Sequence, residues 1–306
     1  MIRRDPYPTR LEHRSDPIPR REPVVHGGAG RDGPLTAQHL AQFERDGFLV
    51  LDGFFRPREV RGFLEDLEAY GRDPALCERP QVIREADSGA IRSIFAIHRL
   101  SGRFDALVRD SRLLELAGQI LDGDVYVHQS RLNRKPAFRG RGFAWHSDFE
   151  TWHAEDGMPA MRCISISVSL TENNDLNGPL LLIPGSHRTF YPTVGATPER
   201  YWERSLQQQR IGVPDVEDLA ASVRDGGIVT ARGGPGTVTV FDCNTLHGST
   251  DNLSAMPRSN LFFVYNSVEN RLQQPFAAAE PRPEWVASRE HVEPLEPLRS
   301  QRSAVA

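Results

Sequence analysis

The pattern of apolar and polar residues is helical in the first part of the chain. Thr36 is a typical N-cap residue, and the apolar-periodic stretch that follows it stops at Gly47, so a helix is expected between them. A short apolar strand is expected at 48–51, and apolar residues at helical spacing predict an amphipathic helix at 58–70. A further helix is expected at about 103–121.

From Val125 to Ser267 the pattern changes to short alternating strands separated by Gly, Asn and Pro turns. One short helix is expected within an insertion, at 198–204. Helices followed by many short strands predict a mainly β protein with flanking helices and a double-stranded β-helix core, which is the cupin-type jelly roll. Such a core closes around a small ligand, and cupin-type members hold a metal inside it.

The two ends of the chain differ in composition from the middle. Residues 1–33 are rich in Pro, Arg and Gly, which predicts an extended or partly disordered arm. Its arginines alternate with Asp, Glu and Pro and are expected to be solvated: Arg3, Arg4, Arg10, Arg14, Arg20 and Arg21. Residues 34–275 are expected to form a single domain, and residues 276–306 a tail rich in Pro and charge.

Length and composition exclude several classes of protein. A chain of 306 residues can bury a substantial core, and 37 Lys and Arg against 41 Asp and Glu leave no basic excess for a nucleic acid. Cys77, Cys163 and Cys243 are widely spaced, which argues against a disulfide framework and fits a reducing cytoplasm. Neither a signal peptide nor an uncharged run of membrane-spanning length is apparent, so we expect no membrane partner.

The first chemical signal is the pair His146 and Asp148. Residues i and i+2 of a strand point the same way, so these two side chains can reach one point in space. One His and one carboxylate are two members of the 2-His-1-carboxylate triad that holds non-haem Fe(II). Alone, the pair is weak evidence, because His-x-Asp is frequent by chance and is often a solvated or backbone-bonded pair.

The second signal combines His247 with Arg258. A strand expected at 238–242 leads to His247, and a loop then connects to Arg258, which opens another β-rich run. Two strands joined in this way let both residues face one cavity. A guanidinium near a metal suits a co-substrate that chelates the metal and offers a distal carboxylate, because Arg binds a carboxylate with two parallel hydrogen bonds. The co-substrate of that shape is 2-oxoglutarate.

The remaining histidines are weaker candidates. His153 could complete a local site with His146, but that choice leaves His247 and Arg258 unexplained. His187 lies at an expected strand end and turn, where a structural role is favoured, and His128 is expected to be a hydrogen-bonded core residue or one that supports the site. Three histidines are expected to be exposed: His13, His26 and His39. Cys243 is expected to be a small apolar filler.

Residues 143–159, with the sequence FAWHSDFETWHAEDGMP, closely resemble the signature of the ectoine hydroxylases. These enzymes are a branch of the phytanoyl-CoA dioxygenase superfamily, whose members use Fe(II) and 2-oxoglutarate. Further segments are similar to that family, at residues 5–10, 91–95, 128–133, 177–180, 241–249 and 257–266. The similarity extends from the N-terminus to about residue 275.

The resemblance implies a role for each residue of the site. His146, Asp148 and His247 would bind Fe(II) and form the catalytic centre. Arg258 would bind the distal carboxylate of 2-oxoglutarate. The other residues implied around the co-substrate are Asn133, Phe143, Ser165 and Ser249. The residues implied around the substrate are Gln129, Trp152, Phe241 and Phe262. Arg131 and Lys135 would either touch the co-substrate or line a solvated mouth.

The implied reaction is the hydroxylation of ectoine to 5-hydroxyectoine, in which O2 and 2-oxoglutarate are consumed and succinate and CO2 are released. An aromatic wall suits ectoine, because aromatic faces attract a delocalised cation. Two alternatives remain: a dioxygenase of the same superfamily that acts on another small zwitterion, and a non-catalytic solute-binding β-sandwich. A homodimer is common for this architecture, and no residue identifies an interface.

Overall fold

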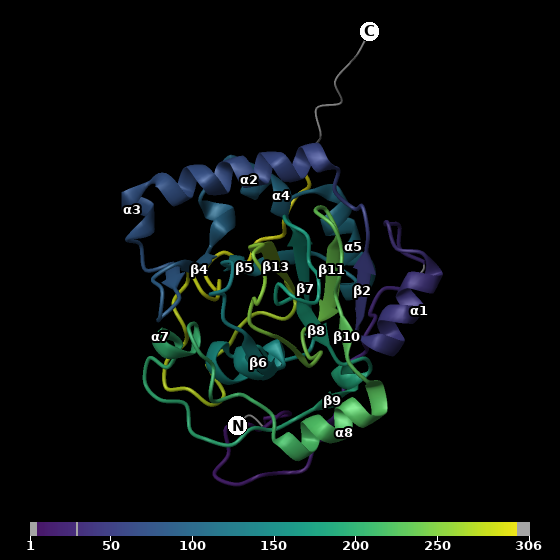
Figure 1. Ribbon diagram of the computed structural model, residues 1–306. Helices are drawn as coiled ribbons and strands as arrows, with labels where there is room; N and C mark the ends of the chain where they lie inside the picture. Colours follow the sequence, from purple (N-terminus) through teal and green to yellow (C-terminus); the bar gives the residue numbers. More distant parts are fainter. Residues whose placement is uncertain (1–4, 29, 299–306) are drawn as a thin grey trace.

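The computed structural model describes residues 5–28 and 30–298 (Figure 1). Its α-helices are α1 (Ala37–Asp46), α2 (Pro57–Arg72), α3 (Pro74–Cys77), α4 (Gly102–Val108), α5 (Ser111–Leu121), α6 (Asp148–Thr151), α7 (Trp202–Ser205) and α8 (Val216–Gly226). Its strands are β1 (Ile18–Pro19), β2 (Phe48–Leu51), β3 (Val82–Arg84), β4 (Ile91–Phe95), β5 (Val125–Lys135), β6 (Phe143–His146), β7 (Cys163–Ser169), β8 (Leu180–Leu182), β9 (Thr189–Phe190), β10 (Val229–Thr230), β11 (Val238–Asp242), β12 (His247–Ser249) and β13 (Arg258–Ser267). Within the described part of the chain, no helix has the length and apolar composition needed to cross a membrane.

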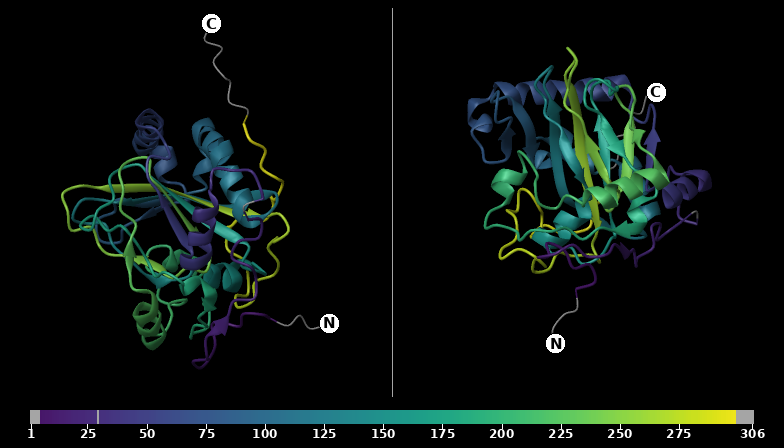
Figure 2. Two further views of the ribbon diagram at one scale, coloured as in Figure 1. Left: turned by 90° about the vertical axis from the view of Figure 1, so that its right-hand side faces the viewer. Right: turned by 60° about the horizontal axis from the view of Figure 1, so that its bottom comes forward.

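Seven antiparallel strands form the larger sheet in the order β2-β11-β7-β13-β5-β4-β3. Strand β7 shows how its two faces differ, because Ile164, Ile166 and Val168 alternate with serines although the whole strand is buried. The apolar residues join the main core beneath α2, α4 and α5. The alternation therefore turns the serines toward the opposite face, where the interior of the barrel is polar. In the left view of Figure 2, the blue and teal helices lie on one side of the strands and the green helix α8 on the other.

A second sheet of four strands, in the order β10-β8-β12-β6, supplies the other wall of the jelly roll. Strand β12 is central to it and pairs with both β6 and β8. The expectation of a mainly β jelly roll with flanking helices is confirmed, including the strands at 238–242 and from Arg258 onward.

Three details of the expected elements are wrong. The helix expected at 103–121 is two helices, because the Asp110 side chain accepts a hydrogen bond from the amide of Arg112 and begins a new helix there. Strands β3 and β4 form a pair between residues 82 and 95, where no strand was expected. The insertion contains α7 at 202–205 and also the longer α8, which was not foreseen.

The N-terminal arm is packed against the barrel over its described residues, and two of its arginines are buried. Arg10 is bonded to Glu150 through Nε and Oε1 at 2.6 Å, and Arg20 pairs with Asp242 at 2.8 Å. Arg14 is about half exposed, as expected, whereas Arg3 and Arg4 lie outside the described residues. The expectation of solvated arginines is therefore wrong for Arg10 and Arg20. The charge of each is compensated by a buried carboxylate that is distant in the sequence, which local composition does not reveal.

Part of the C-terminal segment also packs inward. Val286 and Ala287 are fully buried, and Arg282 forms an ion pair with the buried Asp156, with 2.8 Å between Nε and Oδ1. Residues 299–306 of the expected tail lie outside the described residues. Both ends of the chain therefore contribute buried charges to the side of the barrel that carries residues 148–156.

Replacing Arg10 with Ala is expected to lower the free energy of unfolding by about 3–5 kcal/mol, because Glu150 would remain as a buried carboxylate without its partner. Arg14→Ala is the matched control, because Arg14 is about half exposed and solvent screens its ion pairs, so its loss should destabilise the protein far less. Urea unfolding followed by circular dichroism measures both. Equal losses in the two variants would contradict the structural role of Arg10.

Candidate metal and co-substrate site

Strand pairing brings the two histidines of the expected triad together. In the register of β6 with β12, His146 lies directly opposite His247, and their ring centroids are 4.3 Å apart. The Nε2 atoms of His146 and His247 lie 3.8 Å and 3.9 Å from Oδ1 of Asp148. Among the described residues, these three side chains form the group that could hold a metal ion. One ligand atom of each lies within 4.8 Å of the other two.

Asp148 reaches this point by a different route from the one expected. His146 ends strand β6, and Asp148 is the first residue of α6 instead of a continuing strand. The cause is Ser147, whose hydroxyl accepts a hydrogen bond from the amide of Glu150 at 3.2 Å and caps the new helix. The i, i+2 argument from an extended strand is therefore wrong, although it named the correct pair.

The histidine side chains have the tautomer that a metal requires. Nδ1 of His146 is 2.7 Å from the carbonyl of Ala144, and Nδ1 of His247 is 2.9 Å from the carbonyl of Thr245. Because a carbonyl only accepts, Nδ1 carries the proton and Nε2 is left with a free lone pair toward Asp148. Burial, reinforced by His247, lowers the pKa of His146 to about 4, so its ring is neutral at physiological pH.

The carboxylate of Asp148 is oriented and kept ionised. Burial alone would raise its pKa, but His247, His146, Arg131 and the Ser165 hydroxyl together outweigh that effect and lower it. Ser165 donates its hydroxyl to Oδ2 at 3.1 Å, which leaves Oδ1 facing the two imidazoles. The donor set of two imidazoles and one carboxylate fits Fe(II) with open positions.

A positively charged pocket adjoins the triad. Arg258 donates to the carbonyl of Gly178 at 2.8 Å and to the side chain of Asn133. Its cross-strand neighbour on β5 is Lys135, whose amine donates to the hydroxyl of Ser249 at 2.8 Å. Since Ser249 follows His247 by two residues on β12, the cationic pocket and the metal ligands share one wall.

The charges of this pocket are not compensated by the protein. In the described part of the chain, neither Arg258 nor Lys135 forms an ion pair with a carboxylate. Burial first, then Arg92 and Arg131, lowers the pKa of Arg258 to about 9. Burial first, and then the positive charges of Arg258 and Arg92, lower the pKa of Lys135 to about 6. An anionic ligand would compensate the positive charge of this pocket.

Phe143 borders the same pocket. Its ring has the guanidinium of Arg92 at 3.8 Å and the amine of Lys135 at 5.6 Å from its centroid. The structure thus brings together the residues implied around the co-substrate: Asn133, Phe143, Ser249 and Arg258. Ser165 lies closer to the metal ligands, where its hydroxyl contacts Asp148.

A cavity opens from the triad toward residues 148–156. Its wall includes His146 and Asp148, together with Trp152 and Gln129, which the sequence assigned to the substrate. Gln129 donates its amide to the carbonyl of Val286 at 2.9 Å, so the C-terminal segment fixes the orientation of this side chain.

Phe241 and Phe262 lie differently from Trp152. They belong to an apolar cluster with Phe48 and Leu182, and neither is part of the lining of the cavity. The ring of Phe241 lies 4.9 Å from that of His247, and the guanidinium of Arg131 lies 5.1 Å from the ring of Phe262. In this structure both rings therefore support residues of the site from behind.

The other histidines have structural contacts. Both ring nitrogens of His153 are occupied, by the carbonyl of Met158 at 2.8 Å and by Asp5 at 2.9 Å, so it cannot replace His247 as a ligand. His187 contacts the carbonyl of Glu44 at 3.2 Å, and His128 lies 3.4 Å from Asp156 in the core. His13 is exposed as expected, whereas His26 and His39 are half-buried and the expectation is wrong for both.

Several cavity residues were not assigned from the sequence. Arg131, left undecided, lines the cavity and has no hydrogen bond or ion pair within the described residues. The lining also includes residues that were missed: Ser93, Phe95, Thr151, Glu155, Tyr201, Ser205, Leu206, Gln209 and Arg282. Glu155 lies inside the signature and could have been considered. Arg282 sits in a Pro-rich segment without periodicity, so no sequence signal pointed to it.

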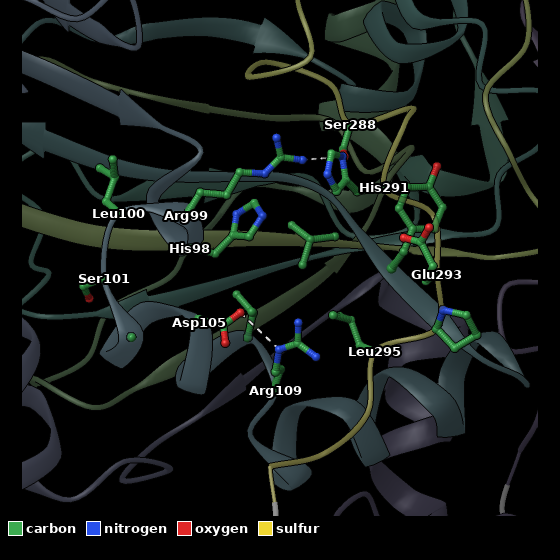
Figure 3. A pocket seen from close by; sticks show the side chains of 15 residues that line it. His98, Arg99, Leu100, Ser101, Asp105, Arg109, Ser288, His291, Glu293 and Leu295 are labelled. Atoms are coloured by element: carbon green, nitrogen blue, oxygen red, sulfur yellow. Dashed lines mark hydrogen bonds and ion pairs between the residues drawn. The ribbon is translucent and has the colours of Figure 1, made fainter.

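A larger pocket, of about 1310 Å³, lies elsewhere, between the region of α4 and the C-terminal segment (Figure 3). Its arginines already have partners, since Arg99 contacts Ser288 and Glu284, and Arg109 contacts Asp105. The triad is absent from its walls. Size alone therefore does not identify the functional cavity.

A jelly roll that holds two histidines and one carboxylate beside a buried arginine defines a non-haem metal oxygenase. The model of the family described as phytanoyl-CoA dioxygenase (PhyH) matches residues 43–260. The chain belongs to the phytanoyl-CoA dioxygenase family.

Individual relatives share nearly the whole chain. The ectoine dioxygenase of Bordetella bronchiseptica is 50% identical over 296 residues, covering 97% of this chain and 96% of its own, and that of Halomonas elongata is 50% identical over 286 residues, covering 92% and 86%. The crystal structure of EctD from S. alaskensis with 2-oxoglutarate and 5-hydroxyectoine superposes with a TM-score of 0.87 at 44% identity and covers 97% of this chain and 99% of its own. The same enzyme with bound Fe gives a TM-score of 0.86.

Replacing Asp148 with Ala is expected to abolish tight Fe(II) binding, because the two imidazoles would lose the charged ligand that faces them. Ser165→Ala should weaken binding only about 10- to 100-fold, since it removes support for the carboxylate and not the ligand itself. Anaerobic equilibrium dialysis with Fe(II) measures both. Undiminished affinity in Asp148→Ala would contradict the ligand assignment.

Proposed function

We propose that this protein is an Fe(II)- and 2-oxoglutarate-dependent dioxygenase that hydroxylates ectoine to 5-hydroxyectoine with release of succinate and CO2. The observation that carries the proposal is the cross-strand pair of His146 and His247 around Asp148, next to a cationic pocket without protein counter-ions. Identity of about one half with ectoine dioxygenases over nearly the entire chain supports the choice of substrate.

In the proposed site, His146, Asp148 and His247 hold Fe(II), which when bound supplies the activation of O2 and of 2-oxoglutarate. Arg258 binds the distal carboxylate of 2-oxoglutarate, with Asn133 and Gly178 fixing the plane of its guanidinium. Ser249 and Lys135 form the adjoining polar wall, and Phe143 closes it against water. Ser165 supports the co-substrate end of the cavity through Asp148.

The substrate is placed in the cavity beside Trp152. The ring of Trp152 and the amide of Gln129 line the space next to the triad. The ring suits the face of a flat cation, and the amide can form a hydrogen bond with the same ligand. Arg131 offers a guanidinium without a protein partner and is suited to a carboxylate in the same space. Phe241 and Phe262 complete the aromatic surroundings by supporting His247 and Arg131.

The chain's own contribution to the reaction is orientation and exclusion of water. The triad is 3–8% exposed, and Trp152 is 2% exposed, so a reaction at the metal would be shielded from bulk solvent. Arg258 would fix the distal end of the co-substrate, and the triad would hold the metal beside the cavity that Trp152 lines.

Further parts of the proposal concern the whole protein. Residues 34–275 form the dioxygenase domain, with the arm of residues 1–33 and the tail from residue 276 packed on it where they are described. The protein acts in the cytoplasm, which agrees with the free thiols of Cys77, Cys163 and Cys243. Its partners are small molecules, with neither a nucleic acid nor a membrane, and a homodimer is its proposed assembly.

The direct test is an assay of the purified protein, loaded anaerobically with Fe(II), in the presence of 2-oxoglutarate, O2 and ectoine. Mass spectrometry should find succinate and 5-hydroxyectoine in equal amounts. Succinate without 5-hydroxyectoine would indicate a dioxygenase whose substrate is another small zwitterion. Neither product from an iron-loaded protein would favour the solute-binding alternative.

Arg258→Lys is expected to raise KM for 2-oxoglutarate about 10- to 100-fold, because an ammonium cannot form two parallel hydrogen bonds with a carboxylate. Arg134→Lys is the matched control, since Arg134 lies on the neighbouring strand β5 with an exposed side chain. Steady-state kinetics with varied 2-oxoglutarate measures both. A KM within twofold of the wild-type value in Arg258→Lys would contradict the role of Arg258.

The affinity for 2-oxoglutarate is expected to fall as pH rises above about 6. In the free protein the pKa of Lys135 is about 6, so its amine is neutral above that pH, and binding of a dianion must draw a proton to it. The apparent Kd should therefore rise by up to about tenfold per pH unit above 6 and be flat below it. Anaerobic calorimetry across pH 5.5–8.5 tests this, and Lys135→Met should remove the slope; an unchanged slope in that variant would exclude Lys135 as its source.

A further inference from the structure

The carboxylates around the substrate cavity differ in how well the protein neutralises them. Asp148 belongs to the metal triad. Asp156 is paired with Arg282 through two hydrogen bonds, one of them 2.8 Å long. Glu155 also lines the cavity and is only 2% exposed, and it has no guanidinium of its own.

Glu155 shares a single arginine with Glu150. Arg10 donates to both oxygens of Glu150, from Nε at 2.6 Å and from Nη2 at 2.9 Å. The same Nη2 contacts one oxygen of Glu155 at 3.1 Å, and no other hydrogen bond to Glu155 occurs in residues 5–28 and 30–298. One positive charge therefore serves two carboxylates, and the surplus negative charge belongs to the one that faces the cavity.

The surroundings of Glu155 make this surplus costly without a ligand. Burial raises the pKa of the Glu155 carboxyl. The positive charges of Arg282 and Arg10 oppose this rise, and the negative charges of Asp156 and Glu150 add to it. A cation in the cavity would reverse that rise and stabilise the ionised form. The enclosed position thus favours a cationic ligand over a neutral one of the same shape.

The position of Glu155 also restricts the shape of that cation. Trp152 and Glu155 belong to the same π-helical segment, Trp152–Asp156, and both line the cavity. An aromatic face and a carboxylate edge together complement a flat, delocalised cation that carries N–H groups in its plane. Arg131, whose guanidinium forms no hydrogen bond or ion pair with the described residues, lines the same cavity and suits an opposite charge on the same ligand.

We propose that Glu155 is the residue that selects for a cationic ring, with its carboxylate paired to the amidinium N–H groups of the substrate while the ring lies against Trp152. The proposal rests on the proposed function, because it assigns the amidinium of ectoine to one wall of the same cavity. It makes charge, and not only shape, the basis on which neutral cyclic acids of similar size are rejected.

Glu155→Gln tests the proposal, since it keeps the shape and an acceptor for Arg10 but removes the charge. KM for ectoine should rise about 10- to 100-fold, the effect of losing a charge-assisted hydrogen bond, whereas kcat at saturation and the Kd of 2-oxoglutarate should change less than twofold. Glu150→Gln is the matched control from the same ion-pair network, because Glu150 is not part of the lining of the cavity. It should lower Tm without a rise in KM for ectoine.

A second measurement compares a cationic and a neutral probe of the same shape. Acetamidinium should inhibit the wild-type enzyme at least 10-fold more strongly than the neutral acetamide, in competition with ectoine, and Glu155→Gln should lose this preference. Equal inhibition by the two probes, or equal rises in KM in Glu155→Gln and Glu150→Gln, would overturn the proposal. Absence of ectoine turnover by the wild type would instead overturn the proposed function, and thermal shifts with the two probes would still decide for or against Glu155.

Discussion

Burial of charge is the constraint on which this structure depends. The barrel encloses many ionised groups, and an unpaired charge in a medium of low dielectric is costly. Within the described residues, four buried arginines have carboxylate partners: Arg10, Arg20, Arg92 and Arg282. These pairs hold the arm, the tail and the strands against one another.

The groups without such partners mark the places where ligands belong. Arg258, Lys135 and Arg131 have no carboxylate partner in the described residues. Arg258 and Lys135 lie where the anionic co-substrate is proposed, and Arg131 lines the substrate cavity. Asp148 has no guanidinium partner in the described residues, and Glu155 shares Arg10 with Glu150, so both leave negative charge toward the cavity. The distribution of uncompensated charge thus separates the binding machinery from the framework, although both are equally buried.

The framework explains why residues distant in sequence act together. Arg10 comes from the first described residues and Arg282 from the last part of the chain, and both contact the segment of residues 148–156 that carries Asp148 and Trp152. The two ends of the chain therefore fix the wall of the cavity, while the central strands fix the metal ligands.

The sequence determined the chemistry of the site, because ligand types are local properties. The signature around His146 and Asp148, the later His247 and Arg258, and the alternation of Ser and Ile in β7 were all readable from the residues. The tertiary structure decided which partners compensate the buried charges. Composition made the arm at Arg10 and Arg20 appear solvated, and it gave no sign that Arg282 enters the cavity. The physical reason is that an ion pair between residues 100 or more positions apart depends on how the chain folds, and neither periodicity nor spacing records it.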